Sequence, residues 1–195
     1  MTTRILFICT GNTCRSPMAE GLLRIMAEQA GVSLEVRSAG VAAANGSPVS
    51  RHAADILSRR GANVLGQSSP LSQEAVEWAT LILTMTANHK RLLIAQYPDA
   101  IDKTHAFKEF VEDDIEVQAT LRERQELAAD LQIKKALGHG VLLEEMERLY
   151  ELERSIPNFD IQDPFGGDRS EYESCAAEIE DTLHKLLNKL QTGEK

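Results

Sequence analysis

The chain has 195 residues, of which 43% are hydrophobic, so it suits one folded domain with a sizeable core and is not a disordered chain. Its formal net charge of −9 argues against nucleic acid as the main partner, because phosphate backbones are held by clustered Lys and Arg. The three cysteines, Cys9, Cys14 and Cys175, are too few and too unevenly placed for the disulfide framework of a secreted protein.

The chain starts with neither the hydrophobic segment of a signal peptide nor a run long enough to span a bilayer, so we expect a cytoplasmic protein without membrane contact. Residues 4–9, "RILFIC", are apolar and followed by turn residues, which predicts a buried strand. Ser16 as N-cap and Pro17 as first helical residue predict a helix that continues over 18–31 and ends at Gly31. Its apolar face comprises Leu22, Leu23, Ile25 and Met26.

Strands and helices are expected to alternate along most of the remaining chain. Further strands are predicted at residues 34–40, 79–85 and 103–107. Further helices are predicted at residues 50–61, 71–78, 87–97 and about 170–190. This alternation with short loops indicates an α/β fold, an open parallel sheet with helices on both faces. Ligands of such sheets bind beyond the carboxyl ends of the strands, and Cys9 stands at such an end.

Residues 112–158 differ in composition from the rest of the chain. Twelve acidic and six basic residues give this segment a net charge of −6, against −9 for the whole chain. Its pattern predicts two charged amphipathic helices separated at "GHG". The faces that they would bury carry Leu127 and Leu131 in the first helix and Leu142, Met146 and Leu149 in the second. We therefore expect a single domain over residues 1–195 with a helical-hairpin insertion at 112–158.

The segment "CTGNTCRS", residues 9–16, leads from the first strand into the first helix. Backbone N–H groups in such a loop can converge on an anion, and the N-terminus of the helix adds to the attraction. Arg15 offers a planar fork that matches phosphate oxygens. The same positive field favours the thiolate of Cys9, which is the nucleophilic form. The loop therefore predicts a phosphate site at which a cysteine attacks phosphorus.

Other residues can support this chemistry. Gly11 allows a close approach of the backbone or a positive φ, and Asn12 tolerates the left-handed conformation and can brace the loop. Ser16 is close enough in the chain to donate to the sulfur. The leaving group needs an acid to protonate it, and Asp163 in "DIQDPFGG" is the candidate. The alternative interpretations are a buried structural cysteine beside a surface arginine, and an ordinary Asp-Pro turn.

The chain resembles the low-molecular-weight protein tyrosine phosphatases. The resemblance rests on "CTGNTCRSPMAE" near the N-terminus, on "RSAG" at residues 37–40 and on "DPFGG" before the last helix. It covers residues 1 to about 111 and 159 to 190, and its motifs are specific. It implies an enzyme that acts on phosphorylated proteins and needs no metal or organic cofactor.

The resemblance also implies roles for individual residues. Cys9 forms a phosphocysteine intermediate, Arg15 binds the phosphate, and Asp163 acts as acid and then as base. Ser38 supports Asn12. The loop residues implied in phosphate binding and in modulating the thiolate are Thr10, Gly11, Asn12, Thr13, Cys14 and Ser16.

Thr13, the fifth position of the loop, bears on the substrate. Tyrosine-specific members of the family usually carry an aliphatic residue there, whereas bacterial protein-arginine phosphatases resemble this chain in "GNTCRS" and "DPFGG". A guanidinium leaving group has N–H donors that a phenol lacks, so Thr13 and Asp163 can discriminate by hydrogen bonding, while Phe165 can flank the planar group. We therefore predict a protein-arginine phosphatase. In the alternative, Thr13 is a tolerated variant in a tyrosine phosphatase.

Two other functions are less favoured. An arsenate reductase of similar architecture requires redox cysteines downstream of the loop, and none lies between Cys14 and Cys175. A catalytically silent phosphate-binding module is disfavoured because nucleophile, arginine and acid are all present. Cys14 is either a packed residue or the partner of Cys9 in a reversible disulfide, and Cys175 is expected to be structural.

The histidines and the insertion complete the sequence-based expectations. None of the five histidines lies beside a pattern of acids or cysteines, so none is assigned a catalytic role. The 112–158 insertion precedes Asp163, which places it near the rim of the active site if the resemblance holds. It is expected either to pack on its own domain, to contact the substrate as a lid, or to mediate a dimer.

Overall fold

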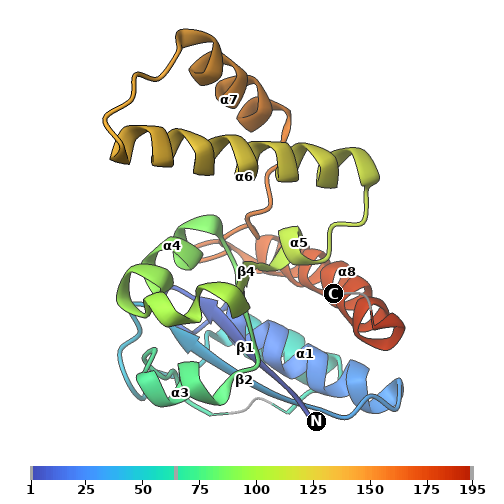
Figure 1. The fold of residues 1–195 in the computed structure, drawn as a ribbon. Coiled ribbons are helices and arrows are strands. Elements are labelled where there is room, and N and C mark those ends of the chain that lie inside the picture. The colour runs from blue at the N-terminus through green and yellow to red at the C-terminus, as the bar shows by residue number, and fades with distance from the viewer. Residues whose placement is uncertain (1, 64–65, 194–195) are drawn as a thin grey trace. The chain divides into compact units, whose positions relative to one another are not determined.

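The computed structural model describes residues 2–63 and 66–193. Its centre is a sheet in the order β2-β1-β3-β4, in which every neighbouring pair of strands is parallel (Figure 1). The strands are β1 (Thr3–Cys9), β2 (Leu34–Gly40), β3 (Leu81–Thr84) and β4 (Thr104–Ala106). Within the described ranges, no helix is both long and apolar enough to cross a membrane.

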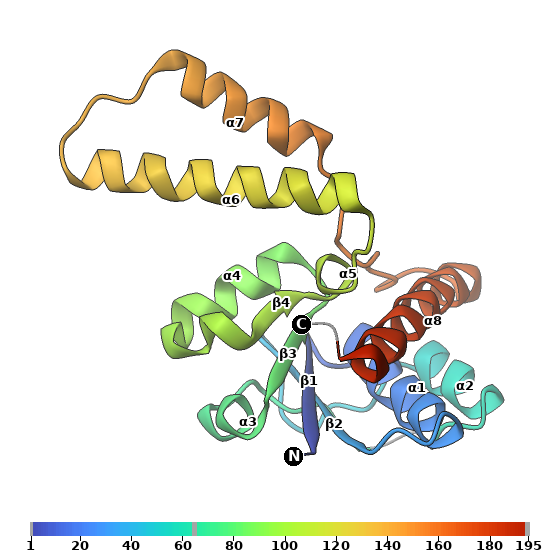
Figure 2. The same cartoon turned by 45° about the vertical axis from the view of Figure 1, so that its right-hand side comes forward.

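Helices cover both faces of this sheet (Figure 2), which confirms the predicted α/β class. The face that presents Ile5 and Phe7 packs against α1 (Arg15–Gln29), α2 (Arg51–Arg59), α5 (Phe107–Phe110) and α8 (Arg169–Thr192). The face that presents Leu6 and Ile8 packs against α3 (Gln73–Trp78), α4 (Ala87–Gln96) and the 3₁₀-helix η1 (Pro98–Lys103). Successive side chains of a strand point to opposite faces, so the continuous apolar run of β1 fills two cores.

The register of the sheet brings the ends of three strands together. Cys9 pairs with Gly40 at the end of β2, and Ile8 pairs with Thr84 at the end of β3. The loops that follow these strands therefore begin side by side, at the edge where open parallel sheets bind ligands.

Outside residues 112–158, the predicted strands and helices occur where expected, with two differences. Helix α1 begins at Arg15, so the prediction that Ser16 is its N-cap is wrong. The Ser16 hydroxyl instead lies against Cys9 and Asn12. The short helices α5 and η1 are not predicted, because four to six residues show too little periodicity to be recognised in a sequence.

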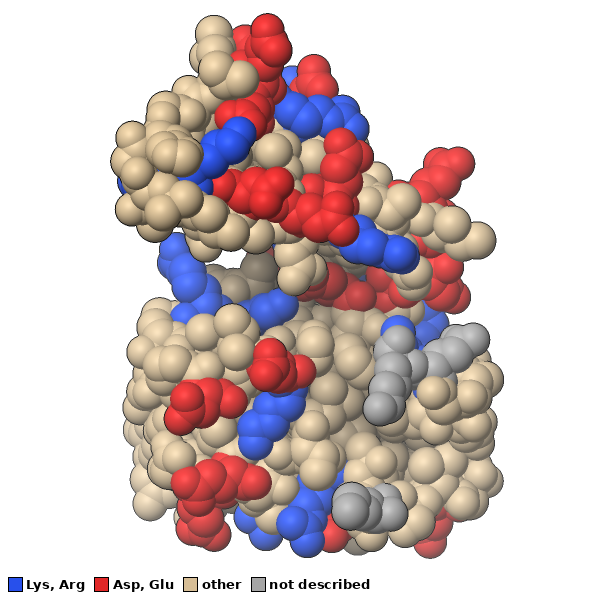
Figure 3. All heavy atoms as spheres, viewed as in Figure 1, with Lys and Arg blue, Asp and Glu red and all other residues tan. Residues whose placement is uncertain are grey.

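Residues Glu112–Asn158 form one compact unit, and Met1–Val111 with Phe159–Lys195 form the other. We call them the hairpin unit and the sheet unit. The hairpin unit contains α6 (Ile115–Ala136) and α7 (Leu143–Ser155), separated at "GHG". Ion pairs Arg148–Glu123, at 2.7 Å, and Lys134–Glu145 join the two helices. In Figure 3, acidic and basic side chains are interspersed over this unit.

Few apolar side chains of the hairpin unit are buried. Of residues 112–158, all of which the structure describes, Leu131 and Leu152 are buried. Leu142 and Met146 are 62% and 51% exposed, so their predicted place on a buried face is wrong. Two helices cover only the stripe along which they touch, and Leu142 and Met146 stand at the N-terminal end of α7, next to the connecting loop. Partly buried are Leu127 and Leu149.

Candidate active site

The loop between β1 and α1 wraps around the sulfur of Cys9. The backbone N–H of Asn12 points to Cys9 Sγ at 3.2 Å, and Ser16 Oγ lies 2.9 Å from the same sulfur. Ser16 Oγ accepts a hydrogen bond from Asn12 Nδ2 at 3.0 Å, which leaves the serine hydroxyl hydrogen to donate to the sulfur. Two donors aimed at one sulfur stabilise its thiolate form.

Asn12 braces the loop through its side chain. Its φ of 54° lies in the left-handed region, whereas Gly11 has no positive φ. Asn12 Nδ2 donates to Ser38 Oγ at 2.8 Å, and Asn12 Oδ1 accepts from the backbone N–H of Ser69, also at 2.8 Å. Ser38 Oγ in turn donates to Glu20, a carboxylate whose pKa is raised by burial. The side chain of this left-handed residue is therefore held by two hydrogen bonds away from the sulfur, to Ser38 and Ser69, and by one to Ser16 beside it.

Steric crowding requires a glycine at position 40, the last residue of "RSAG". A Cβ atom at this position would lie 2.5 Å from the backbone oxygen of Thr10 and 2.9 Å from the backbone nitrogen of Asn12. The end of β2 therefore approaches the loop so closely that only glycine fits. The motif "RSAG" includes Gly40 but does not reveal this supporting role, because a glycine at the end of a strand is also typical of an ordinary turn.

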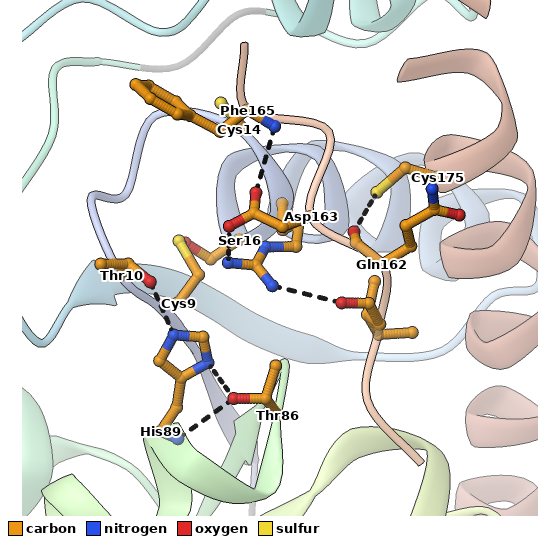
Figure 4. Close-up of polar contacts among 12 residues, drawn as sticks. Cys9, Thr10, Cys14, Ser16, Thr86, His89, Gln162, Asp163, Phe165 and Cys175 are labelled. Carbon is orange, nitrogen blue, oxygen red and sulfur yellow. Dashed lines mark hydrogen bonds and ion pairs between the residues drawn. The ribbon is translucent and has the colours of Figure 1, made fainter. Parts of the chain in front are cut away.

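Arg15 and Asp163 form an ion pair across the site. Arg15 is buried, and its Nη2 donates to Asp163 Oδ2 at 2.7 Å while its Nη1 donates to the backbone oxygen of Ile161 at 3.2 Å (Figure 4). The segment before Asp163 is tethered on both sides, because Ile161 N donates to the Met85 oxygen at 2.8 Å and Cys175 Sγ lies 3.3 Å from the Gln162 oxygen. The carboxyl group thus sits on a fixed loop.

The structure brings most of the sequence-predicted residues to one pocket of about 230 Å³. Its lining consists of Cys9, Thr10, Gly11, Thr13, Cys14, Arg15, Asp163 and Phe165. Asn12, Ser16 and Ser38 do not line it and lie behind the loop. The Phe165 ring is 78% exposed and its backbone N–H donates to Asp163 Oδ1 at 3.2 Å. An apolar wall, a thiol, a cation and a carboxyl group therefore face a single small volume.

The other two cysteines have different surroundings from Cys9. Cys14 Sγ lies 3.1 Å from the Tyr172 hydroxyl and 3.6 Å from Thr13 Oγ1, and burial together with this contact raises the pKa of Tyr172 to about 12. Burial raises the pKa of Cys175 to about 12, as for a structural thiol. All three thiols are free, and the reversible pairing of Cys9 with Cys14 stays a prediction.

His89 is a second residue of the site, after Gly40, to which the sequence assigns no role. It is 4% exposed, in the first turn of α4, and its Nε2 lies 2.8 Å from Thr10 Oγ1 (Figure 4). Its Nδ1 lies 2.8 Å from Thr86 Oγ1. Burial, and then the nearby Arg15, lower its pKa to about 4. The sequence does carry one indication of this place: His89 follows closely after β3, which pairs with the strand that ends at Cys9.

Comparison with known proteins identifies the family. Residues 4–132 and 143–195 match the model for low molecular weight phosphotyrosine protein phosphatases. The chain belongs to this family. This phosphatase is 37% identical over 194 residues to the protein-arginine-phosphatase of Geobacillus stearothermophilus, with 100% of both chains covered. It is 33% identical over 191 residues to that of Bacillus subtilis (strain 168), covering 98% of this chain and 99% of the relative.

A solved structure agrees with this assignment. The phosphatase superposes with a TM-score of 0.73 on a YwlE arginine phosphatase mutant with a phosphorylated active site serine, at 31% identity and with 98% of each chain covered. The family match enters the hairpin unit from both sides and leaves out residues 133–142. It is therefore wider than the resemblance carried by the motifs alone. Within the described parts of the chain, no group of three or more His, Cys, Asp or Glu is arranged to hold a metal ion.

Proposed function

We propose that this phosphatase is a protein-arginine phosphatase, which hydrolyses phosphoarginine on proteins through a phosphocysteine on Cys9. The observation that carries the proposal is the pocket in which Cys9, Arg15 and Asp163 meet beside Thr13. Similarity along the whole chain to two protein-arginine-phosphatases supports the substrate class. The alternative is a tyrosine phosphatase that uses the same three residues.

In the first step the Cys9 thiolate attacks phosphorus, so that an S–P bond forms and the P–N bond to the guanidinium group breaks. Asp163, protonated at this stage, gives its proton to the leaving nitrogen. Arg15 and the N–H groups of the loop bind the oxygens of the transferred phosphoryl group, which makes residues 9–16 the phosphate-binding loop. The ion pair with the half-exposed Asp163 keeps the buried guanidinium of Arg15 in the pocket before substrate arrives.

In the second step a water oxygen attacks phosphorus and gives its proton to the Asp163 carboxylate. The S–P bond breaks, inorganic phosphate is released and Cys9 leaves as a thiolate. The Asn12 N–H and the Ser16 hydroxyl already point at that sulfur, so they stabilise the negative charge that it recovers. The fixed loop lets one carboxyl group serve both steps.

Thr13 supplies the proposed preference for phosphoarginine. It lines the pocket and is partly buried, and its Oγ1 lies 3.6 Å from Cys14 Sγ. A hydroxyl can accept from a guanidinium N–H, which a phenol ester does not offer. The exposed Phe165 ring can stack on the planar guanidinium.

The test is phosphate release from an arginine-phosphorylated protein and a tyrosine-phosphorylated peptide, measured side by side. We expect the wild type to prefer phosphoarginine, and Thr13→Ile to shift the ratio of the two kcat/KM values towards phosphotyrosine by about tenfold, as for loss of one hydrogen bond. Cys9→Ser controls for background hydrolysis. A wild type that prefers phosphotyrosine would contradict the proposal and favour the alternative, a tyrosine phosphatase.

We further propose that residues 112–158 are an insertion that contacts the protein substrate. Exposed apolar side chains gather where its two helices meet the connecting loop: Ile133, Leu137, Leu142, Leu143 and Met146. Apolar side chains grouped on a surface often mark a contact with another protein. The second candidate occupant is another copy of the chain.

Deletion of residues 112–158 tests this role of the hairpin unit. We expect activity on arginine-phosphorylated protein to fall more than activity on a small phosphate ester. Equal effects on both substrates contradict the substrate contact. Size-exclusion chromatography of wild type and deletion variant shows whether the unit serves a dimer instead.

A further inference from the structure

We infer that Thr10, held by His89, is a second specificity-determining residue, which accepts a hydrogen bond from the guanidinium group of phosphoarginine. The inference deepens the proposed function and rests on it. Thr10 follows the nucleophile directly, lines the pocket and is exposed. Its side chain is therefore available to the leaving group rather than to the core.

His89 fixes the side chain of Thr10 through a short chain of contacts. Both ring nitrogens of His89 are 2.8 Å from a threonine hydroxyl, Nε2 from Thr10 and Nδ1 from Thr86. Thr86 Oγ1 also accepts the backbone N–H of His89 at 3.2 Å, as the cap of α4. The ring cannot rotate without losing both contacts, so the Thr10 hydroxyl is held in one position at the end of β1 (Figure 4).

Thr10 Oγ1 keeps acceptor capacity in either tautomer of His89. A hydroxyl has one hydrogen and two lone pairs. If Nε2 donates to Thr10, one lone pair is used; if Nε2 accepts, the hydroxyl hydrogen is used and both lone pairs stay available. Among the described residues, His89 is the one partner seen for this hydroxyl. A guanidinium group, which has only donors, can use that acceptor.

The charge of His89 suits a cationic leaving group. With a pKa lowered to about 4, the ring is neutral near pH 7 and does not repel a guanidinium. Figure 4 shows Thr10 and Asp163 on either side of the Cys9 sulfur. The leaving guanidinium can therefore receive a proton from Asp163 while it donates an N–H to Thr10. A phenol leaving group makes only the first of these contacts.

Thr10→Val and Thr10→Ser form the matched test pair, since valine keeps the shape without the hydroxyl and serine keeps the hydroxyl. The readout is the ratio of kcat/KM for an arginine-phosphorylated peptide to that for a tyrosine-phosphorylated peptide. We expect Thr10→Val to lower this ratio by about tenfold, the order of one lost hydrogen bond, and Thr10→Ser to keep it.

His89 is tested through its coupling to Thr10. We expect His89→Ala to lower the same ratio, and the double variant with Thr10→Val to lower it no further than Thr10→Val alone, because His89 acts through Thr10. His89→Gln, which can still reach the Thr10 hydroxyl, is expected to recover part of the ratio and decides the matter if His89→Ala does not fold.

The failures can be told apart. A wild type without activity on phosphoarginine overturns the proposed function. A wild type that prefers phosphoarginine, with a ratio unchanged in Thr10→Val, overturns the present inference alone. Equal losses on both peptides in a folded His89 variant also overturn it, since they reveal a purely structural role for the ring.

Discussion

The sheet unit and the hairpin unit differ in what their side chains contact. In the sheet unit, the loop after β1 is held by contacts that reach β2, α4 and the segment before α8. In the hairpin unit, the contacts are mainly ion pairs between exposed side chains and a narrow apolar seam at Leu131 and Leu152. Exposed ion pairs contribute little to stability.

Substitutions should therefore have larger effects in the sheet unit than in the hairpin unit. A residue of the loop after β1 is constrained by several elements at once, so a small change displaces the side chains that line the pocket. A residue on the outer faces of α6 or α7 has few neighbours to disturb. The predictions below test this contrast, beginning with the largest expected effect.

Asp163→Asn removes the proposed proton donor but keeps its size. We expect kcat on phosphoarginine to fall by about 10² to 10⁴-fold, the usual contribution of a general acid. Steady-state phosphate release measures it, and the thermal unfolding temperature serves as a control for folding. A loss below about tenfold would falsify the assignment of Asp163.

Gly40→Ala and Gly140→Ala place the same methyl group in the two units. At Gly40 the new Cβ meets backbone atoms of the loop at 2.5 and 2.9 Å, so we expect activity to fall about 100-fold from displacement of the loop. At Gly140 no atom lies within 4 Å, and we expect no change. Similar effects of the two substitutions on phosphate release would contradict the expectation that the loop after β1 is more sensitive to substitution than the hairpin unit.

His89 is expected to make stability depend on pH. Its pKa is about 4 in the folded protein against 6.5 normally, so below pH 6.5 the unfolded chain binds a proton that the folded protein does not. The free energy of unfolding should fall by about 2 to 3 kcal/mol as pH drops from 6.5 to 4, with no such loss above 6.5.

Urea unfolding across this pH window measures the effect, with His89→Gln as the matched variant. The groups that face His89, namely Arg15, Asp160 and Asp163, are present in both proteins. The difference between the two curves therefore isolates the histidine. Parallel curves between pH 6.5 and 4 would show that the ring titrates normally.

Met146→Ala is expected to have the smallest effect. The side chain is half exposed on α7, so we expect unfolding free energy to change by less than about 0.5 kcal/mol and activity on a small phosphate ester to stay the same. Leu152→Ala, at the buried seam, should instead speed amide hydrogen exchange in α7. Equal exchange in both variants would mean that the seam does not hold the helices together.

Much of the fold follows from local patterns. The apolar run of β1 and the spacing of strands and helices predict the parallel sheet, because each element must bury its apolar side chains against a neighbour. Which faces of α6 and α7 are buried does not follow from such patterns. Leu142 and Met146 have the helical spacing of a buried face, but they are exposed. Periodicity shows which face is apolar and not whether anything packs on it.

The loop with Cys9 and Arg15, the position of Asp163 and the family of the chain follow from the sequence alone, because these residues stand in short contiguous motifs. Tertiary structure decided that Ser16 serves the sulfur and that Gly40 and His89 reach the loop. The reason is that a hydrogen bond or a close backbone approach depends on distance in space. Thr10 and His89 are 79 positions apart in the chain and become neighbours only through the pairing of β1 with β3.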